Sequence, residues 1–256
     1  VAGDQQAATI GQGCLVPGQA KATLGTGAFI LAPVGDAPPR SDHRLLGTIL
    51  CQLDGRRRYA LEGSIFVAGS LVKWLRDALG LVGSAQETEA LARSVANNGG
   101  VSLLPALSGL GAPHWRPEAR GVIAGLTQGT TRAHIVRAAL ESIAHQAHDL
   151  AGAFAADGAP WTSLRLDGGM SANDWIAQDM ADMLDIAVER PADVETTARG
   201  AAMLAALGAG LHASIEAAAA RLPGRQRFAP AMDARVRADR LKTWGALLAA
   251  SERALP

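Results

Sequence analysis

One stretch around residue 167 limits what this chain can fold into more than any other. Residues 164–166 alternate as the end of a buried strand does, and Asp167-Gly168-Gly169 then forces a sharp turn. Ser171, with Asp174 three residues later, has the pattern of a capping box, and an apolar helical face follows it. The stretch therefore predicts a strand that passes through a glycine turn directly into a helix.

The same turn has two interpretations. Glycines let a ligand approach bare backbone, and a helix start offers unpaired N–H groups, so the turn suits a nucleotide. An ordinary tight connection between a strand and a helix would have the same sequence. The rest of the chain has to decide between the two.

Length, charge and cysteine usage exclude several classes of protein. The 256 residues suffice for one large domain or two small ones. The net charge is zero and aromatic residues make up 4%, so no basic, aromatic-rich stripe indicates a nucleic-acid partner. No apolar run reaches the roughly 20 residues that cross a bilayer, so we expect no membrane span. Cys14 and Cys51 lie far apart without a pairing pattern, which favours the cytoplasm.

Strands dominate the first part of the chain. Residues 21–31 are typical of a strand, a tight Gly25-Thr26-Gly27 turn and a second strand. Residues 45–53 and 56–61 predict a hairpin around Asp54-Gly55. Antiparallel pairing is therefore expected near the N-terminus.

Helices alternate with strands further along. Apolar residues between positions 65 and 79 share one helical face, which predicts a helix with Gly69 inside it. Thr131 precedes a long amphipathic helix, residues 186–189 predict a strand, and residues 196–207 predict a helix. This order predicts an α/β fold with a mixed sheet flanked by helices.

Candidate catalytic and binding residues each have a structural alternative. Asp4, followed by Gln5, either caps a helix or accepts a proton from a substrate hydroxyl. Thr26 either belongs to a plain hairpin turn or binds a phosphate together with backbone N–H groups. His145 and His148 have no third ligand, so we predict no metal site there. The sequence contains neither a P-loop nor a complete G-x-G-x-x-G motif.

Several short motifs, in order and at family spacing, favour the functional interpretations. Together they resemble the C-terminal half of the glycerol kinases, in the carbohydrate kinase family of the actin-like ATPase superfamily. The resemblance extends from residue 1 to about residue 211 and implies an actin-like, ribonuclease H-like domain. The motifs are residues 3–8, 25–29, 61–63 with 68–69, 109–113, 121–141, 167–169 with Asn173, and 196–202.

The resemblance implies roles on the substrate side. Asp4 would be the general base that accepts the proton of the substrate hydroxyl, and it would bind the polyol together with Gln5. Phe29 would cover the carbon backbone of the polyol. Such roles suit phosphoryl transfer, in which the protein mainly positions groups and an aspartate takes the hydroxyl proton.

The resemblance also implies a nucleotide site. Thr26 would bind the terminal phosphates, and Gly69 and Lys73 would border the ribose or the phosphates. Gly169 and Asn173 would flank the adenosine. ATP would be the co-substrate, with Mg²⁺ held mainly by the phosphates and by another domain.

Two departures from the family pattern bear on the structure. Lys73 stands where a glutamine is common, which would strengthen the attraction for phosphate. Arg116 follows Trp115 where the family usually has an acidic residue, so we expect this loop to contact something else.

The resemblance implies that residues 1–256 are the C-terminal nucleotide-binding domain of a two-domain kinase for glycerol. The N-terminal domain would carry the magnesium-binding aspartate and most polyol contacts, and the start at Val1 indicates a fragment. The chain alone would then be inactive. Kinases for other polyols or sugars, such as pentuloses, remain alternatives, as does a non-catalytic nucleotide-binding or assembly module. Homo-oligomer formation is left open.

Overall fold

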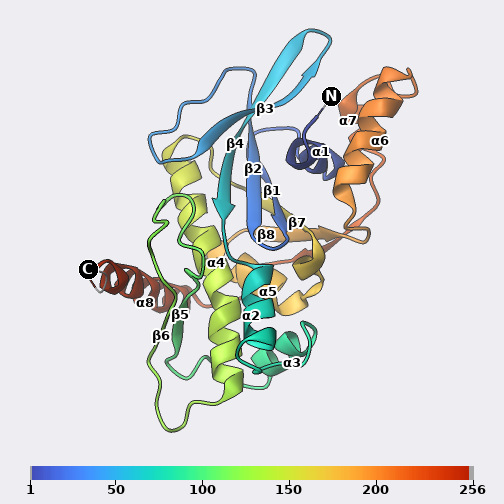
Figure 1. Cartoon of the computed structure of the whole chain (residues 1–256). Coiled ribbons are helices and arrows are strands. Elements are labelled where there is room, and N and C mark those ends of the chain that lie inside the picture. The colour runs from blue at the N-terminus through green and yellow to red at the C-terminus, as the bar shows by residue number, and fades with distance from the viewer. Residues whose placement is uncertain (1, 254–256) are drawn as a thin grey trace.

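A seven-stranded mixed sheet forms the centre of the computed structural model, which describes residues 2–253 (Figure 1). The strand order is β3-β4-β2-β1-β7-β8-β9, with β1, β7 and β8 parallel and all other neighbours antiparallel. The predicted mixed sheet is therefore confirmed, although β9 was not predicted. The strands are β1 (Gln19–Leu24), β2 (Ala28–Gly35), β3 (Leu46–Leu53), β4 (Arg56–Ile65), β7 (Ser163–Asp167), β8 (Ala187–Pro191) and β9 (Arg225–Phe228).

Helices cover both faces of this sheet. α4 and α5 pack on one face, and α1, α6 and α7 pack on the other. The first half of the long α4 also packs against α2 and a separate pair of short strands, β5 (Ser102–Leu104) and β6 (Val122–Ala124). The helices are α1 (Asp4–Gly11), α2 (Gly69–Asp77), α3 (Glu87–Arg93), α4 (Arg132–Ala156), the 3-10 helix η1 (Gly169–Ala172), α5 (Asp174–Leu184), α6 (Thr196–Gly208), α7 (Ile215–Ala219) and α8 (Ala234–Arg253).

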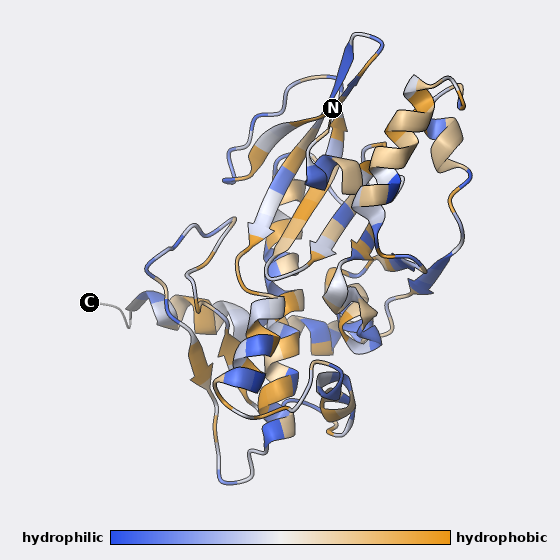
Figure 2. Cartoon of the chain, turned by 45° about the vertical axis from the view of Figure 1, so that its right-hand side comes forward, coloured by the Kyte–Doolittle hydropathy of each residue, from blue (hydrophilic) through white to orange (hydrophobic). Residues whose placement is uncertain are grey.

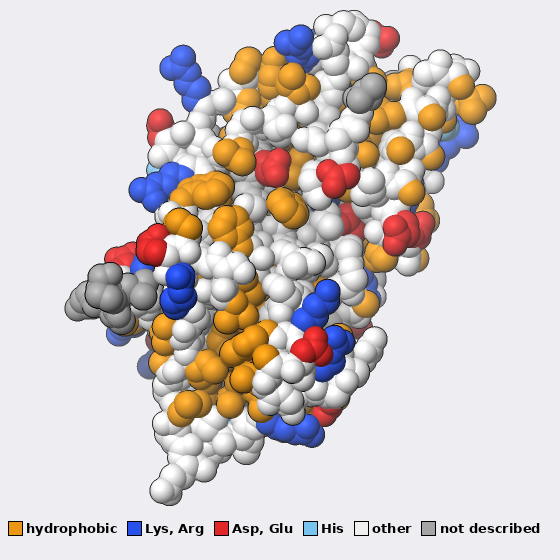
Figure 3. Space-filling view, viewed as in Figure 1, with side chains coloured by type: hydrophobic (Ala, Val, Ile, Leu, Met, Phe, Trp, Pro, Cys, Tyr) orange, Lys and Arg blue, Asp and Glu red, His pale blue; other side chains and the backbone are white. Residues whose placement is uncertain are grey.

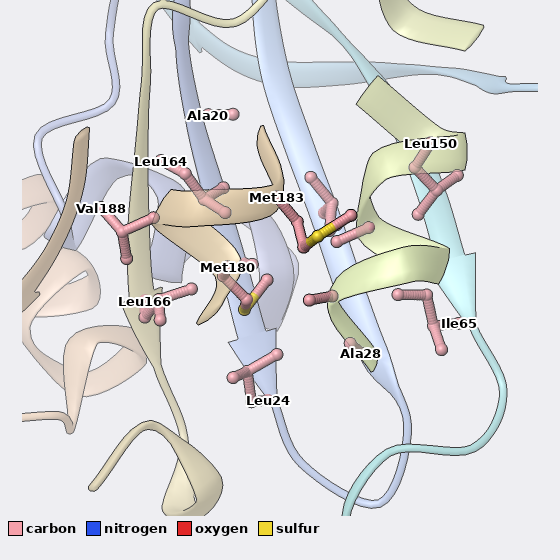
Figure 4. Packing of buried hydrophobic residues seen from close by; sticks show 14 of the residues in the cluster. Ala20, Leu24, Ala28, Ile65, Leu150, Leu164, Leu166, Met180, Met183 and Val188 are labelled. Atoms are coloured by element: carbon pink, nitrogen blue, oxygen red, sulfur yellow. The ribbon is translucent and has the colours of Figure 1, made fainter. Parts of the chain in front are cut away.

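The main core lies between the sheet and the α4–α5 layer. Leu164 and Leu166 of β7 point toward Met180 and Met183 of α5, and Leu150 of α4 closes the same layer (Figure 4). Burying each such side chain contributes about 1.5–3 kcal/mol. The hydropathy of the residues agrees with this burial: the strands of the sheet contain apolar residues, whereas the projecting end of the β3–β4 hairpin is hydrophilic (Figure 2). No helix within residues 2–253 has both the length and the apolar composition that a membrane-spanning helix needs.

Local turn signals gave correct strand pairs, but the helix predicted over residues 65–79 begins later than expected. Asp54 and Gly55 both have positive φ, 49° and 74°, as a tight hairpin requires. In contrast, β4 continues to Ile65, which pairs with Ala28 of β2, so α2 begins only at Gly69. Gly69 is therefore the first residue of α2 and not an interior one. Pairing between distant strands outweighed the local helical periodicity of residues 65–79.

Close contact between α1 and α6 depends on Gly200. A Cβ at Gly200 would lie 1.8 Å from the carbonyl oxygen of Ala7. Gly200→Ala is therefore expected to lower the free energy of unfolding by about 1–3 kcal/mol or more, because the two helix backbones must separate. Urea unfolding measures this change.

Gly152→Ala is the matched control for that substitution. Gly152 lies inside α4, and a Cβ there would meet no atom within 4 Å. Alanine should raise the free energy of unfolding at this position by up to about 1 kcal/mol. Equal effects of the two substitutions would contradict the proposed packing role of Gly200.

Candidate functional site

A cavity of about 390 Å³ opens where the sheet meets α2 and α3. Basic side chains lie over these two helices on the face shown in Figure 3. Lys73 and Arg76 of α2 line the cavity; Arg76 is paired with Asp77 at 2.6 Å, whereas the Lys73 ammonium adds a positive charge that suits an anion. All five residues predicted for the nucleotide line this cavity: Thr26, Gly69, Lys73, Gly169 and Asn173.

The β1–β2 turn forms one wall of the cavity and is fixed to the start of α2. The N–H of Gly69 donates to the Gly25 carbonyl at 2.9 Å, and the N–H of Ser70 donates to the Thr26 carbonyl at 3.0 Å. A Cβ at Gly69 would lie 2.4 Å from the Gly25 oxygen, so only glycine fits there. The turn that carries Thr26 is thereby held against a helix N-terminus.

The glycine turn after β7 forms the opposite wall. Gly168 has a φ of 82° and packs against the carbonyl of Leu24, so this position requires glycine. Gly169 differs, because a Cβ there would meet no atom within 4 Å. Its backbone therefore borders open space in the cavity, as the close approach of a ligand requires.

The predicted helix start after this turn is wrong in detail. Asn173 is the N-cap of α5, and its Oδ1 accepts from the N–H of Ile176 at 3.1 Å. The hydroxyl of Ser171 instead donates to the Gly168 carbonyl at 2.7 Å. The inserted helix η1 occupies residues 169–172, which moves the cap from Ser171 to Asn173. Asn173 thus has a structural role in addition to facing the cavity.

Helix α3 closes a further side of the cavity, which the sequence did not indicate. Nδ2 of Asn173 donates to Oγ1 of Thr88 at 3.3 Å, and the N–H of Asp174 donates to Oε2 of Glu89 at 3.2 Å. Both α3 residues line the cavity. Nothing in the local sequence of a short polar helix marks these residues as ligand-facing.

Asp4 lies at the N-terminus of α1, on the other side of the β1–β2 turn. The prediction that Asp4 caps the helix is wrong, because Gly3 is the N-cap and Asp4 is the first helical residue. Its Oδ1 accepts from the N–H of Gln5 at 2.7 Å, and its side chain is exposed. The Asp4 carboxylate is therefore held at an exposed helix N-terminus.

Gln5 and Phe29 are connected through two residues of β1. Nζ of Lys21 donates to Oε1 of Gln5 at 2.5 Å and to Oγ1 of Thr23 at 3.0 Å. Thr23 lies directly opposite Phe29 in the antiparallel β1–β2 pair, so their side chains share one face of the sheet. Phe29 is 40% exposed on this face. The structure thus brings the predicted polyol residues to the α1 side of the sheet.

The β1–β2 turn therefore lies between the two groups of predicted residues. Thr26 lines the cavity, while Thr23 and Phe29, three residues away on either side, belong to the Asp4 side. This arrangement suits the transfer of a phosphate from a nucleotide in the cavity to a hydroxyl near Asp4.

The buried carboxylate of Asp167 connects three elements next to the two groups of predicted residues. It is 1% exposed, and its Oδ2 accepts from Nε2 of Gln12 at 3.2 Å and from the hydroxyl of Thr196. Gln12 ends α1 and Thr196 begins α6, so one carboxylate joins both helices to the end of β7. Asp167 lies outside the cavity lining, and its side-chain bonds to Gln12 and Thr196 hold the end of β7, where the glycine turn begins.

Arg116 and His145 have structural roles. Arg116 contacts the C-terminal helix, where its guanidinium donates to the hydroxyl and the carbonyl of Ser251, both at 3.2 Å. His145 is buried and stacks on Trp244, with ring centroids 5.2 Å apart. Burial lowers the pKa of His145 to about 3, so the imidazole stays neutral. Among residues 2–253 no group of three or more His, Cys, Asp or Glu side chains could hold a metal ion.

The fold and the site define an α/β domain of the carbohydrate kinase type, with the actin-like, ribonuclease H-like arrangement that was expected. The C-terminal domain of the FGGY family of carbohydrate kinases matches residues 20–209. This chain belongs to that family.

Individual relatives refine the comparison. The chain is 52% identical over 242 residues to a glycerol kinase from Rhodospirillum centenum, covering 94% of this chain and 49% of that protein. Among solved structures, a Plasmodium falciparum glycerol kinase with ADP has a TM-score of 0.90 and 37% identity, covering 99% of this chain and 50% of that one. A xylulose kinase from Rhodospirillum rubrum has a TM-score of 0.84 and 27% identity, covering 98% and 51%. The chain spans about half the length of the curated relatives it matches.

Proposed function

We propose that this chain is the C-terminal nucleotide-binding domain of a longer two-domain kinase, called the parent enzyme below. The cavity is the observation that carries the proposal, because it gathers five predicted nucleotide residues from separate segments of the chain. The likeness to a glycerol kinase that was solved with ADP supports an adenine nucleotide as its ligand. In this proposal ATP is the phosphoryl donor.

Glycerol is the acceptor that we propose, with glycerol 3-phosphate as the product. Relatives 51–53% identical are named glycerol kinases, whereas the xylulose kinase from R. rubrum is 27% identical. Asp4 accepts the proton of the attacking hydroxyl, Gln5 hydrogen-bonds the polyol, and the exposed ring of Phe29 lies against its carbon atoms. The alternatives are a kinase for another polyol and a non-catalytic nucleotide-binding module.

The remaining parts of the reaction follow from the same arrangement. Thr26 and the N–H groups of its turn bind the terminal phosphates, and Lys73 adds a positive charge at the cavity wall. The described residues offer no ligand cluster for Mg²⁺, so in the proposal the phosphates and the other domain hold the metal. Both cysteines are free and buried, which supports a reducing compartment such as the cytoplasm.

The test is an ATP-dependent phosphorylation assay of the purified parent enzyme with glycerol, xylulose and related polyols. The proposal is supported if kcat/KM is highest for glycerol. If kcat/KM is highest for another polyol, the first alternative is supported. ATP binding without turnover on any acceptor supports the non-catalytic module.

Gly169→Val is expected to weaken ATP binding at least about tenfold, because the new side chain fills cavity space next to the backbone. The fold should survive, since a Cβ at this position meets no atom within 4 Å. Calorimetric titration of the parent enzyme with ATP measures the effect.

Gly245→Val is the matched control for the cavity substitution. Gly245 is exposed in α8, outside the cavity, and a Cβ there also meets no atom within 4 Å. This variant should bind ATP as the unchanged protein does. Unchanged ATP affinity in folded Gly169→Val protein would remove Gly169 from the adenosine site.

A further inference from the structure

Lys21 is a fully buried lysine beside the predicted base. It is 0% exposed on β1, and its ammonium donates to Oε1 of Gln5 at 2.5 Å and to Oγ1 of Thr23 at 3.0 Å. Both acceptors are neutral oxygens. The side chain therefore joins the start of α1 to the sheet without forming an ion pair through these bonds.

Keeping a charge at this position is costly. Burial lowers the pKa of Lys21 to about 8, and the nearby carboxylate of Asp167 opposes this shift. An apolar side chain of the same length would fill the space without the cost of removing an ammonium from water. Packing alone therefore does not explain a lysine here.

The chemistry of the ammonium group determines how Gln5 is oriented. An ammonium only donates hydrogen bonds, so the carboxamide of Gln5 must turn its oxygen toward Lys21. The NH₂ group of Gln5 then points away from Lys21. Gln5 is half-buried and directly follows the exposed Asp4 in α1, so the residue that carries this NH₂ group is the chain neighbour of the predicted base.

We propose that Lys21 is a positioning residue that fixes the Gln5 carboxamide so that its NH₂ group donates to an oxygen of the acceptor polyol. This inference rests on the proposed function. Lys21 itself does not reach the substrate, since no part of it is exposed. In this role it acts through Gln5, and not through its charge on the nearby Asp4 carboxylate, so the effect of replacing Lys21 depends on Gln5 being present.

A double-mutant cycle in the parent enzyme tests this dependence. Lys21→Met is expected to lower kcat/KM for glycerol about 10–100-fold, the size of one lost buried hydrogen bond, mainly by raising the KM for glycerol. The KM for ATP should change less than about threefold, because Lys21 is outside the cavity lining. In a Gln5→Ala background, Lys21→Met should have less than about threefold further effect.

The outcomes separate the inference from the proposed function. A parent enzyme without activity on any polyol overturns both. An active parent enzyme in which the two substitutions are fully additive, or in which Lys21→Met raises both KM values equally, overturns the positioning role alone. Lys242→Met, which removes an exposed lysine of α8, is the control and should match the unchanged enzyme.

Gln5→Glu provides a second test if Lys21→Met does not fold. A glutamate keeps an oxygen partner for the Lys21 ammonium but has no NH₂ group to offer the substrate. We expect a folded protein with a similar 10–100-fold loss of kcat/KM for glycerol. An unchanged KM for glycerol in this variant would overturn the role of the Gln5 NH₂ group and with it that of Lys21.

Discussion

Replacement of Asp4 by asparagine in the parent enzyme is expected to lower kcat about 10²–10⁴-fold, the usual contribution of a general base. The affinity for ATP should change little, because Asp4 lies at the start of α1 and does not line the nucleotide cavity. Steady-state kinetics with glycerol and ATP varied separately gives both values.

Asparagine is a conservative test of the base. Its Oδ1 can still accept from the N–H of Gln5, the bond that holds the Asp4 side chain in the structure. The start of α1 should therefore persist while the basic oxygen is lost. Asp36→Asn is the matched control, since Asp36 is an exposed aspartate whose side chain pairs with Arg56 on the protein surface. A several-fold loss or less in Asp4→Asn would exclude Asp4 as the base.

Local patterns predicted much of the fold. The Asp54-Gly55 hairpin and the strand before Asp167 were correct because their signals lie within a few neighbouring residues. The long helix after Thr131 was also correct, where the N–H of Thr131 donates to Nδ1 of His134 at 3.1 Å. In each case the residues that determine the conformation are adjacent in sequence.

The errors arose where distant segments decide the local structure. Ile65 ends a strand because it pairs with Ala28, which no local periodicity reveals. Strand β9 (Arg225–Phe228) consists largely of polar residues and forms only by pairing with β8. Tertiary pairing of this kind overrides intrinsic propensity.

In the candidate site, too, local sequence identified some residues and missed others. The glycines of the cavity were recognisable, because a glycine at a turn indicates positive φ or close backbone approach. Lys21 was not, because a lysine in a strand is ordinarily a solvent-exposed residue. Thr88 and Glu89 were also missed, since their position at the cavity depends on how α3 packs beside Asn173.

The 256-residue chain by itself is expected to fold but not to phosphorylate glycerol. Its sheet is covered by helices on both faces and has an extensive core, which supports independent folding. Phosphoryl transfer in addition requires a metal ion, and commonly a cleft that closes around both substrates. The described residues include no metal-binding cluster, and the chain spans about half the length of its curated relatives.

A coupled ADP-release assay of the purified chain with ATP and glycerol measures this directly. We expect turnover below detection, whereas the parent enzyme in the same assay serves as the positive control. Calorimetric measurement of ATP binding shows whether the chain still forms its cavity. We expect weak binding, because part of the contact set lies on the other domain. Glycerol-dependent turnover of the isolated chain at roughly 1–100 per second, the range of ordinary kinases, would show that a second domain is not required. The proposal that catalysis needs two domains would then be wrong, even if Asp4 and the cavity residues had the roles assigned to them.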